Sequence, residues 1–299
     1  MTVTLFCRQM TVFFLILTTF KFTHTTYAET DDVIRVFLFA GQSNMVGADA
    51  HANRIDDLPE FKGAGAPQDQ VLYSYILGNG DEASKGWGPL RPLSSFGPEL
   101  TFARMVTHQI SSPIAIIKSA VGGTTVAFDW YPDAPENGQK LYPRTLQLVR
   151  DSLQELDRRG LRYRLEGVMW HQGENDMLDR KLNTQYADGL TRLITRLRAD
   201  LKAPDLKWYM AEVSEKGIWG MDNRSNLSIL RQQQDMVRKT DPPRALGANI
   251  TPGVRGDGER SATLSFWHAG PAPDGRSVCR GVPQRDRPAT PLSRPQLQE

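Results

Sequence analysis

Four apolar runs, separated by segments of helical periodicity, constrain the fold of this 299-residue chain more than any other feature. The runs occupy residues 33–40, 114–121, 165–170 and 207–213. Between them, apolar side chains recur at three- and four-residue spacing, as in Leu146, Val149, Leu153 and Leu156, and again in Leu190, Leu193, Leu197 and Leu201. Near-continuous apolar strands that alternate with amphipathic helices predict an α/β protein whose parallel sheet is covered on both faces.

Two further segments complete this reading. Phe102, Met105 and Val106 indicate another helix, which begins near the sequence "GPEL". Residues 50–92 are rich in Gly, Pro and Asp, and we expect them to form a long excursion on the active-site side of the sheet.

The composition excludes some classes of partner. Hydrophobic residues make up 39% of the chain and charged residues 23%, which is ordinary for a soluble globular protein. Lys and Arg number 36 and Asp and Glu 34, which leaves a net charge of +2 without a basic block, so no nucleic-acid partner is expected. We expect a protein that acts on small molecules or carbohydrates.

The first 28 residues are typical of a targeting segment. Arg8 precedes a short apolar run at residues 12–20, and the sequence "TYA" offers a small-residue cleavage site after Ala28. The run is much shorter than the roughly 20 residues of a membrane-spanning helix. We therefore predict a signal peptide at residues 1–28, a secreted or periplasmic protein, and no membrane span after cleavage.

Cysteine chemistry contributes little to the expected mature protein. Cys7 lies in the predicted signal peptide, which leaves Cys279 alone. A single cysteine forms no internal disulfide and no cysteine zinc site.

Polar, glycine-marked sequences follow three of the apolar runs. They are "GQSNM", "SAVGGTT" and "WHQGEND". Ligands of parallel sheets bind beyond the carboxyl ends of the strands, so these exits are expected to meet at one edge. Ser43 or Asn44 could simply cap the following helix, but the convergence of the three exits favours a functional site.

Acyl transfer is the chemistry that these exits could share. The Ser43 hydroxyl would be the nucleophile once a base removes its proton. The backbone N–H groups of Ser43 and of Gly122 or Gly123, together with the side-chain amide of Gln172, could stabilise the oxyanion. The motif differs from the Gly-x-Ser-x-Gly elbow, because Met45 stands at the second glycine position.

The sequences "FLFAGQSNMVG", "KSAVGGTT" and "GVMWHQGENDM", in this order, resemble the sialate O-acetylesterase domain family. This family includes acetylxylan esterases and belongs to the SGNH-hydrolase superfamily, and the resemblance covers roughly residues 33–248. It implies a three-layer α/β/α sandwich, flavodoxin-like, with a mostly parallel central sheet. It also implies hydrolysis of acetyl esters on sugars, of the xylan or sialic acid type, without a metal or other cofactor.

The resemblance also implies roles for individual residues. Ser43 matches the nucleophile, Gly122, Gly123 and Gln172 match the oxyanion-hole positions, and Glu174 matches a carboxylate that some members use as the triad acid. Simpler roles are a plain turn for the two glycines, a loop hydrogen bond for Gln172 and a solvated or supporting carboxylate for Glu174.

Three aromatic residues near these motifs have structural interpretations. In the family pattern His171 supports its loop, and we expect a hydrogen-bonded loop histidine rather than a base. Trp170 and Trp208 are expected in the core.

The end of the chain departs from the family pattern. SGNH enzymes take their base from a late histidine in an Asp-x-x-His arrangement, followed by Phe or Tyr. No such arrangement follows Asn249, because His268 is the last histidine and Ser265 stands three residues before it. We therefore predict an esterase domain at residues 29–249 and an atypical tail at residues 250–299.

The tail is either a disordered linker or the product of a shifted reading frame. It is crowded with Gly, Pro and Arg and contains no lysine. Read one base later, codons for residues 265–273 can encode His-Phe-Gly-Thr-Pro-Gly-Gln-Leu, which resembles the family's histidine block, but no Asp can stand three residues before that histidine. We favour the frameshift, which gives Glu174 more weight as the triad acid.

Two function classes follow. The first is an exported carbohydrate O-acetylesterase, weak or inactive as written because its base histidine is not found. The second is a non-catalytic carbohydrate-binding or remnant protein of the same fold.

Overall fold

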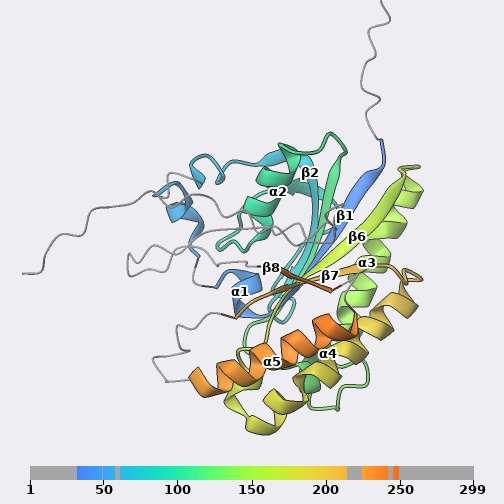
Figure 1. Ribbon diagram of the computed structural model, residues 1–299. Coiled ribbons are helices and arrows are strands. Elements are labelled where there is room, and N and C mark those ends of the chain that lie inside the picture. Colours follow the sequence, from blue (N-terminus) through green and yellow to red (C-terminus); the bar gives the residue numbers. More distant parts are fainter. Residues whose placement is uncertain (1–31, 49, 58–60, 214–223, 242–244, 249–299) are drawn as a thin grey trace, which may run out of the picture.

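A mostly parallel sheet of eight strands forms the centre of the structure (Figure 1). This computed structural model describes residues 32–48, 50–57, 61–213, 224–241 and 245–248. The predicted signal peptide and the atypical tail, with His268, lie outside the described residues.

The strands lie in the order β3-β2-β5-β1-β6-β7-β8, and β4 pairs with β2. Their bounds are β1 (Ile34–Gly41), β2 (Gln68–Leu77), β3 (Glu82–Ala83), β4 (Gly88–Leu90), β5 (Ile114–Ala120), β6 (Tyr163–His171), β7 (Lys207–Ala211) and β8 (Ala245–Ala248). The pairs from β2 to β8 are parallel, whereas β3 and β4 run antiparallel to β2. The predicted mostly parallel sheet is confirmed.

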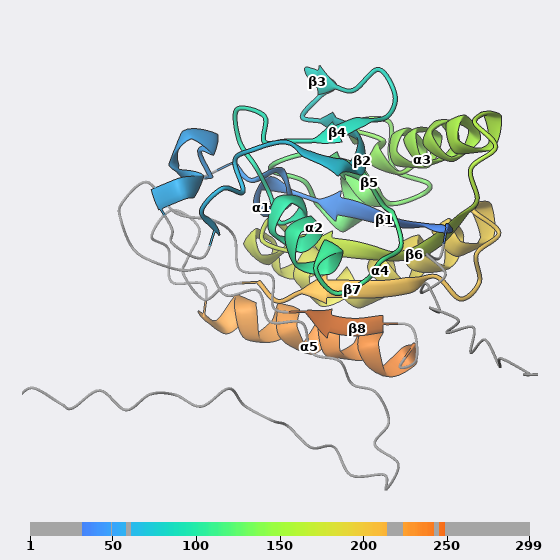
Figure 2. The same cartoon turned by 90° about the horizontal axis from the view of Figure 1, so that it is seen from above.

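Helices cover both faces of the sheet (Figure 2). Their bounds are α1 (Ser43–Val46), α2 (Glu99–Thr107), α3 (Leu141–Arg158), α4 (Arg180–Asp200) and α5 (Arg224–Thr240), with the short turns η1 (Ala52–Asp57), η3 (Val126–Trp130) and η4 (Asp176–Leu178). Helices α3, α4 and α5 share a core with one face of the sheet, and α1, α2 and η1 share a second core with the other. The structure is therefore the expected three-layer α/β/α sandwich.

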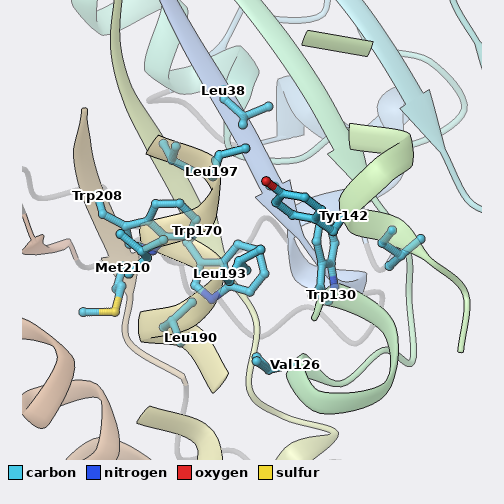
Figure 3. Packing of buried hydrophobic residues seen from close by; sticks show 14 of the residues in the cluster. Leu38, Val126, Trp130, Tyr142, Trp170, Leu190, Leu193, Leu197, Trp208 and Met210 are labelled. Carbon is cyan, nitrogen blue, oxygen red and sulfur yellow. The ribbon is translucent and has the colours of Figure 1, made fainter. Parts of the chain in front are cut away.

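Three tryptophans lie at the centre of the larger core (Figure 3). The ring centroids of Trp130 and Trp170 are 5.0 Å apart at an edge-to-face angle of 80°, and those of Trp170 and Trp208 are 5.5 Å apart. Aromatic pairs favour such tilted arrangements. The expectation that Trp170 and Trp208 are core residues is confirmed.

The periodic positions of the sequence face these cores. Val149 and Leu156 of α3 and Leu190 of α4 are fully buried, and so is every residue of β5. A strand that is buried on both faces must be apolar almost throughout, which is why "IAIIKSA" shows no alternation.

The expectation for residues 50–92 is wrong in part. This segment adds β2 to the sheet beside β5, and it also contains η1, β3 and β4. Strand β2 has Val71 and Tyr73 in the second core and is flanked by Gly- and Pro-rich turns. Composition averaged over the segment therefore conceals a strand. Within the described ranges, no helix combines the length and apolarity that crossing a bilayer requires.

Candidate active site

The three polar strand exits meet at the carboxyl edge of the central strands. Gly41 at the end of β1 pairs with Ala120 of β5 on one side and with His171 of β6 on the other. Beside the additional parallel strand β2, the parallel strands β5-β1-β6-β7-β8 follow the flavodoxin-like order 2-1-3-4-5, and the direction in which successive strands are added reverses between β1 and β6. Ligands of this fold class bind in the crevice at that reversal, which is where the exits carrying Ser43 and Gln172 lie.

Gly41 lets the β1 exit approach the β6 exit very closely. Its φ is +152°, and a Cβ atom at this position would lie 2.1 Å from the carbonyl oxygen of His171. The next residue, Gln42, donates its backbone N–H to that same oxygen over 2.9 Å. A side chain at residue 41 would therefore separate the two exits.

Ser43 begins the single-turn helix α1 immediately after this contact and is half-buried. The N-cap residue is Gln42, and no side-chain capping hydrogen bond is present. The interpretation of Ser43 or Asn44 as a cap is therefore wrong. Because the first N–H groups of a helix have no acceptor within the helix, the N–H of Ser43 is available to a ligand; it donates to no acceptor in the part of the chain that the structure describes.

The glycine turn after β5 lies beside Ser43. A Cβ atom on Gly122 would be 3.6 Å from the Cβ atom of Ser43, and Gly123 has a φ of +74°. Both glycines are exposed, and the N–H of Gly122 forms no hydrogen bond within the described ranges. The structure thus brings Gly122 and Ser43 together, as predicted.

Gln172 is fully buried and connects the exits to one another. Its Nε2 atom donates to the carbonyl oxygen of Thr124 over 2.8 Å and to Oδ2 of Asp176 over 2.5 Å, and it lies 3.3 Å from Oε1 of Gln42. These contacts are the loop hydrogen bonds of the simpler interpretation, and no hydrogen bond to Ser43 is formed. The role of Gln172 as an oxyanion donor stays a prediction.

Asp176 is a site residue that the sequence reasoning missed. Its carboxylate is buried and accepts the N–H of Val126 over 3.1 Å as well as the amide of Gln172. Burial raises its pKa to about 7. The hydrogen bonds from Gln172, from Val126 and from the backbone N–H of Asp176 itself oppose this rise. The sequence feature that could have identified Asp176 is its position two residues after Glu174, within the same polar strand exit "WHQGEND".

Glu174 is buried next to α1. Its Oε1 atom accepts a hydrogen bond from Nδ2 of Asn44 and lies 3.7 Å from Nε2 of His171. Its Oε2 atom is buried and has no hydrogen-bond partner among the described residues. One carboxylate oxygen is thus held by α1, and the other can accept a further N–H.

His171 supports the site through its backbone. Its carbonyl oxygen holds Gln42, whereas neither ring nitrogen forms a hydrogen bond to the described residues. The expectation of a side-chain hydrogen bond is therefore wrong. Burial lowers the pKa of the imidazole and so favours its neutral form, and the nearby Glu174 carboxylate only partly opposes this.

The core tryptophans support both turns of the site. Trp130 donates its Nε1–H to Oγ1 of Thr124 over 3.0 Å. Trp170 donates to the hydroxyl of Tyr186, which in turn donates to the carbonyl oxygen of Gln172 over 2.9 Å. The positions of the exits are therefore fixed by the packed centre of the protein.

In the part of the chain that the structure describes, no group of three or more His, Cys, Asp or Glu side chains is placed so that it could bind a metal ion. The polar groups of the site are instead N–H donors, a hydroxyl and carboxylates. This set can bind an ester carbonyl, attack it and stabilise the charge that develops on its oxygen.

The fold and site together define a flavodoxin-like α/β/α protein with a serine at the reversal point of its sheet. The family described as "SASA: Carbohydrate esterase, sialic acid-specific acetylesterase" matches residues 33–246. The chain belongs to this family of carbohydrate esterases, and the resemblance noted in the sequence is confirmed.

Several proteins are similar to this chain. A probable carbohydrate esterase of Arabidopsis thaliana is 29% identical over 201 residues, which cover 61% of this chain and 70% of that protein. The solved structure of an Arabidopsis thaliana protein has a TM-score of 0.52 at 22% identity and covers 72% of this chain and 84% of its own.

Two other solved structures share the fold. The protein NanS has a TM-score of 0.54 at 17% identity, over 77% of this chain and 80% of its own. A carbohydrate acetylesterase from Xanthomonas citri has a TM-score of 0.52 at 18% identity, over 72% of this chain and 49% of its own. At these identities the two structures support the fold alone.

Proposed function

We propose that this protein has the active-site architecture of a carbohydrate O-acetylesterase and that Ser43 is its nucleophile. The observation that carries the proposal is the position of Ser43 at the sheet reversal, beside the glycine turn and with the N–H groups of Ser43 and Gly122 available. Membership of the esterase family supports acetyl esters on sugars as the substrate class.

The reaction would proceed in two halves. A base takes the proton of Ser43 while Oγ attacks the acetyl carbonyl carbon, and the oxyanion is held by the N–H groups of Ser43 and Gly122. Each such donor typically lowers the barrier by about 2.7–4 kcal/mol. The C–O bond to the sugar then breaks, and the sugar oxygen leaves with the proton from the base. Water repeats the sequence on the acetyl-serine and releases acetate.

Glu174 is proposed as the triad carboxylate. Asn44, the neighbour of Ser43, donates to one of its oxygens, and the other oxygen, which is buried and has no partner among the described residues, could accept the N–H of a histidine base. A carboxylate in this position orients the imidazole and stabilises its charged form. Gln172 and Gly123 are proposed to complete the oxyanion hole.

The base itself distinguishes the two candidate functions. Among the described residues, His171 is the only histidine at the strand exits; it is buried, burial lowers its pKa and so weakens it as a base, and it forms no hydrogen bond to Ser43. After residue 249 the sequence lacks the Asp-x-x-His arrangement. We therefore propose that the chain as written hydrolyses esters slowly or not at all, which keeps a non-catalytic carbohydrate-binding role as the second candidate.

We also propose a location and a substrate class. Residues 1–28 contain, in this order, a positively charged residue, an apolar run and small residues, which supports secretion or transfer to the periplasm. An acetylated sugar, of the xylan or sialic acid type, is the proposed partner.

Labelling of the serine tests the proposal directly. A serine-directed phosphonate is expected to modify Ser43 in the chain as written and faster in a version whose tail carries the shifted-frame histidine block. The repaired version should also hydrolyse a short aryl acetate. Ser43→Ala should abolish labelling and hydrolysis, whereas Ser111→Ala, at an exposed serine before β5, should change neither. Normal turnover by the Ser43→Ala protein would exclude Ser43 as the nucleophile.

A further inference from the structure

A buried ion pair contacts the end of α1, and neither of its residues has a role in the proposed chemistry. Nζ of Lys118 and Oε2 of Glu99 are 2.8 Å apart, and the two side chains are only 1% and 4% exposed. Lys118 lies in the middle of β5, between Phe39 of β1 and Tyr75 of β2. Glu99 is the first residue of α2 and belongs to the "GPEL" sequence. The pair therefore connects the sheet to the start of a helix.

This pair also contacts the end of α1. Lys118 donates from Nζ to the carbonyl oxygen of Val46, the last residue of α1, over 3.2 Å. Glu99 accepts the N–H of Gly97 over 3.0 Å, and a Cβ atom on Gly97 would lie 2.3 Å from the carbonyl oxygen of Met45. The loop before α2 and the side chain from β5 thus hold the same end of α1.

Helix α1 depends on such contacts because it has only four residues. Isolated helices shorter than about 12 residues are marginal in water, so neighbouring elements must set the position of a single turn. The start of α1 is held by the hydrogen bond from Gln42 to His171 of β6. Its end is held by Lys118 of β5, so Ser43 is fixed between two anchors on either side of β1.

The stability of the protein does not account for this pair. Replacing a buried ion pair by apolar residues of similar volume is often neutral or stabilising, because both charges lose their hydration when they are buried. An apolar pair would fill the same space but would leave the carbonyl oxygen of Val46 unheld. The geometry points to a role in orientation.

We propose that Lys118 and Glu99 are positioning residues for the nucleophile: Lys118 fixes α1 through Val46, and Glu99 fixes Lys118. Neither residue touches the reacting atoms. The proposal rests on the proposed function of Ser43, but the anchoring of α1 can be measured without any esterase activity. Small displacements of a reacting group can reduce a rate about 100-fold, so loss of the anchor should be visible in the reactivity of Ser43.

The test replaces both charges at once, so that no unpaired charge is buried. In Lys118→Met/Glu99→Leu, hydrogen exchange of the amides of Val46 and of the C-cap residue Gly47, which donate to the carbonyl oxygens of Gln42 and Ser43, should be at least about 10-fold faster than in the wild type. Phosphonate labelling of Ser43, expressed per folded molecule, should be about 10- to 100-fold slower. The urea midpoint should fall only moderately, because the charges are removed together but the Gly97 N–H and the Val46 carbonyl oxygen lose their partners.

A matched control lies on the opposite face of the same strand. Ser119 of β5 and Thr145 of α3 form a buried hydrogen bond of 2.7 Å. The double variant Ser119→Ala/Thr145→Val removes a buried polar pair next to Lys118 without touching α1. Its α1 exchange and its labelling rate should match those of the wild type.

The outcomes separate the two proposals. If α1 exchanges in Lys118→Met/Glu99→Leu as slowly as in the control, the positioning role is wrong, whatever the labelling shows. If no form of the protein labels at Ser43, the nucleophile assignment fails and exchange alone decides the anchor. Should the double variant not fold, Glu99→Gln, which retains the acceptor for Gly97, decides the same comparison: faster exchange in α1 supports the anchor, and unchanged exchange overturns it.

Discussion

Asp176 should make the stability of this protein decrease as the pH rises. Its carboxylate is about 1% exposed, and burial raises its pKa from 3.8 to about 7. The folded state therefore binds the proton more tightly than the unfolded state, so the contribution of Asp176 to stability is greatest below pH 4 and is lost as the pH rises through 7. At 1.36 kcal/mol for each pKa unit, the whole effect is about 4 kcal/mol, of which roughly 2–3 kcal/mol should be lost between pH 5 and pH 8.

The variant Asp176→Asn removes this titration and keeps the size of the side chain. Asn also loses one acceptor for Val126 or Gln172, which should cost about 1–3 kcal/mol at every pH. The informative quantity is therefore the difference in unfolding free energy between wild type and variant, measured at both pH values. Urea unfolding followed by the fluorescence of the buried tryptophans reports it.

Two other buried groups should not disturb this difference. Burial raises the pKa of Tyr186 well above its ordinary value of 10, so this residue stays protonated at both pH values. His171, whose pKa burial lowers, destabilises both proteins when the pH falls below about 6.5. We expect the wild type to lose about 2–3 kcal/mol relative to the variant between pH 5 and pH 8. A relative change below about 1 kcal/mol, or one of opposite sign, would refute the reasoning.

Two further predictions concern the strand exits and the chemistry. Gly41→Ala should destabilise the protein by at least about 2 kcal/mol more than Gly80→Ala, because both glycines have positive φ but only residue 41 would bring a Cβ atom to 2.1 Å from His171. Equal urea midpoints for the two variants would argue against that contact. Chelator treatment should leave the aryl-acetate hydrolysis of the repaired protein unchanged, since serine catalysis needs no metal; a tenfold loss restored by zinc would contradict the mechanism.

The parts of the site that depend on local sequence were predictable. Ser43 and the glycine turn follow apolar strands directly, and parallel strands place their exits at one edge whatever the details of packing. Strand β2 was missed because its ten residues lie within a segment rich in Gly and Pro. Composition over a long window masks a strand that only its neighbour β5 makes stable.

The supporting polar residues were not predictable in the same way. Lys118 stands in a run that otherwise predicts a buried strand, and its partner Glu99 is 19 positions earlier in the chain. Asp176 binds Val126, which is 50 positions away. Such pairs exist only once the strand order is known, because a charged or polar side chain in a core is tolerated according to what lies across from it.

The edge of the sheet at β2 bears on the behaviour of the protein at high concentration. An exposed edge strand offers unpaired N–H and C=O groups to other molecules and promotes intermolecular strand addition. Here the outer side of the ten-residue strand β2 pairs with two short strands. These are β3, with two residues, and β4, with three residues that include Pro89. Short strands interrupted by proline make poor templates for a further strand. This border should therefore resist edge-to-edge aggregation, so that the long strand beside it does not recruit other chains.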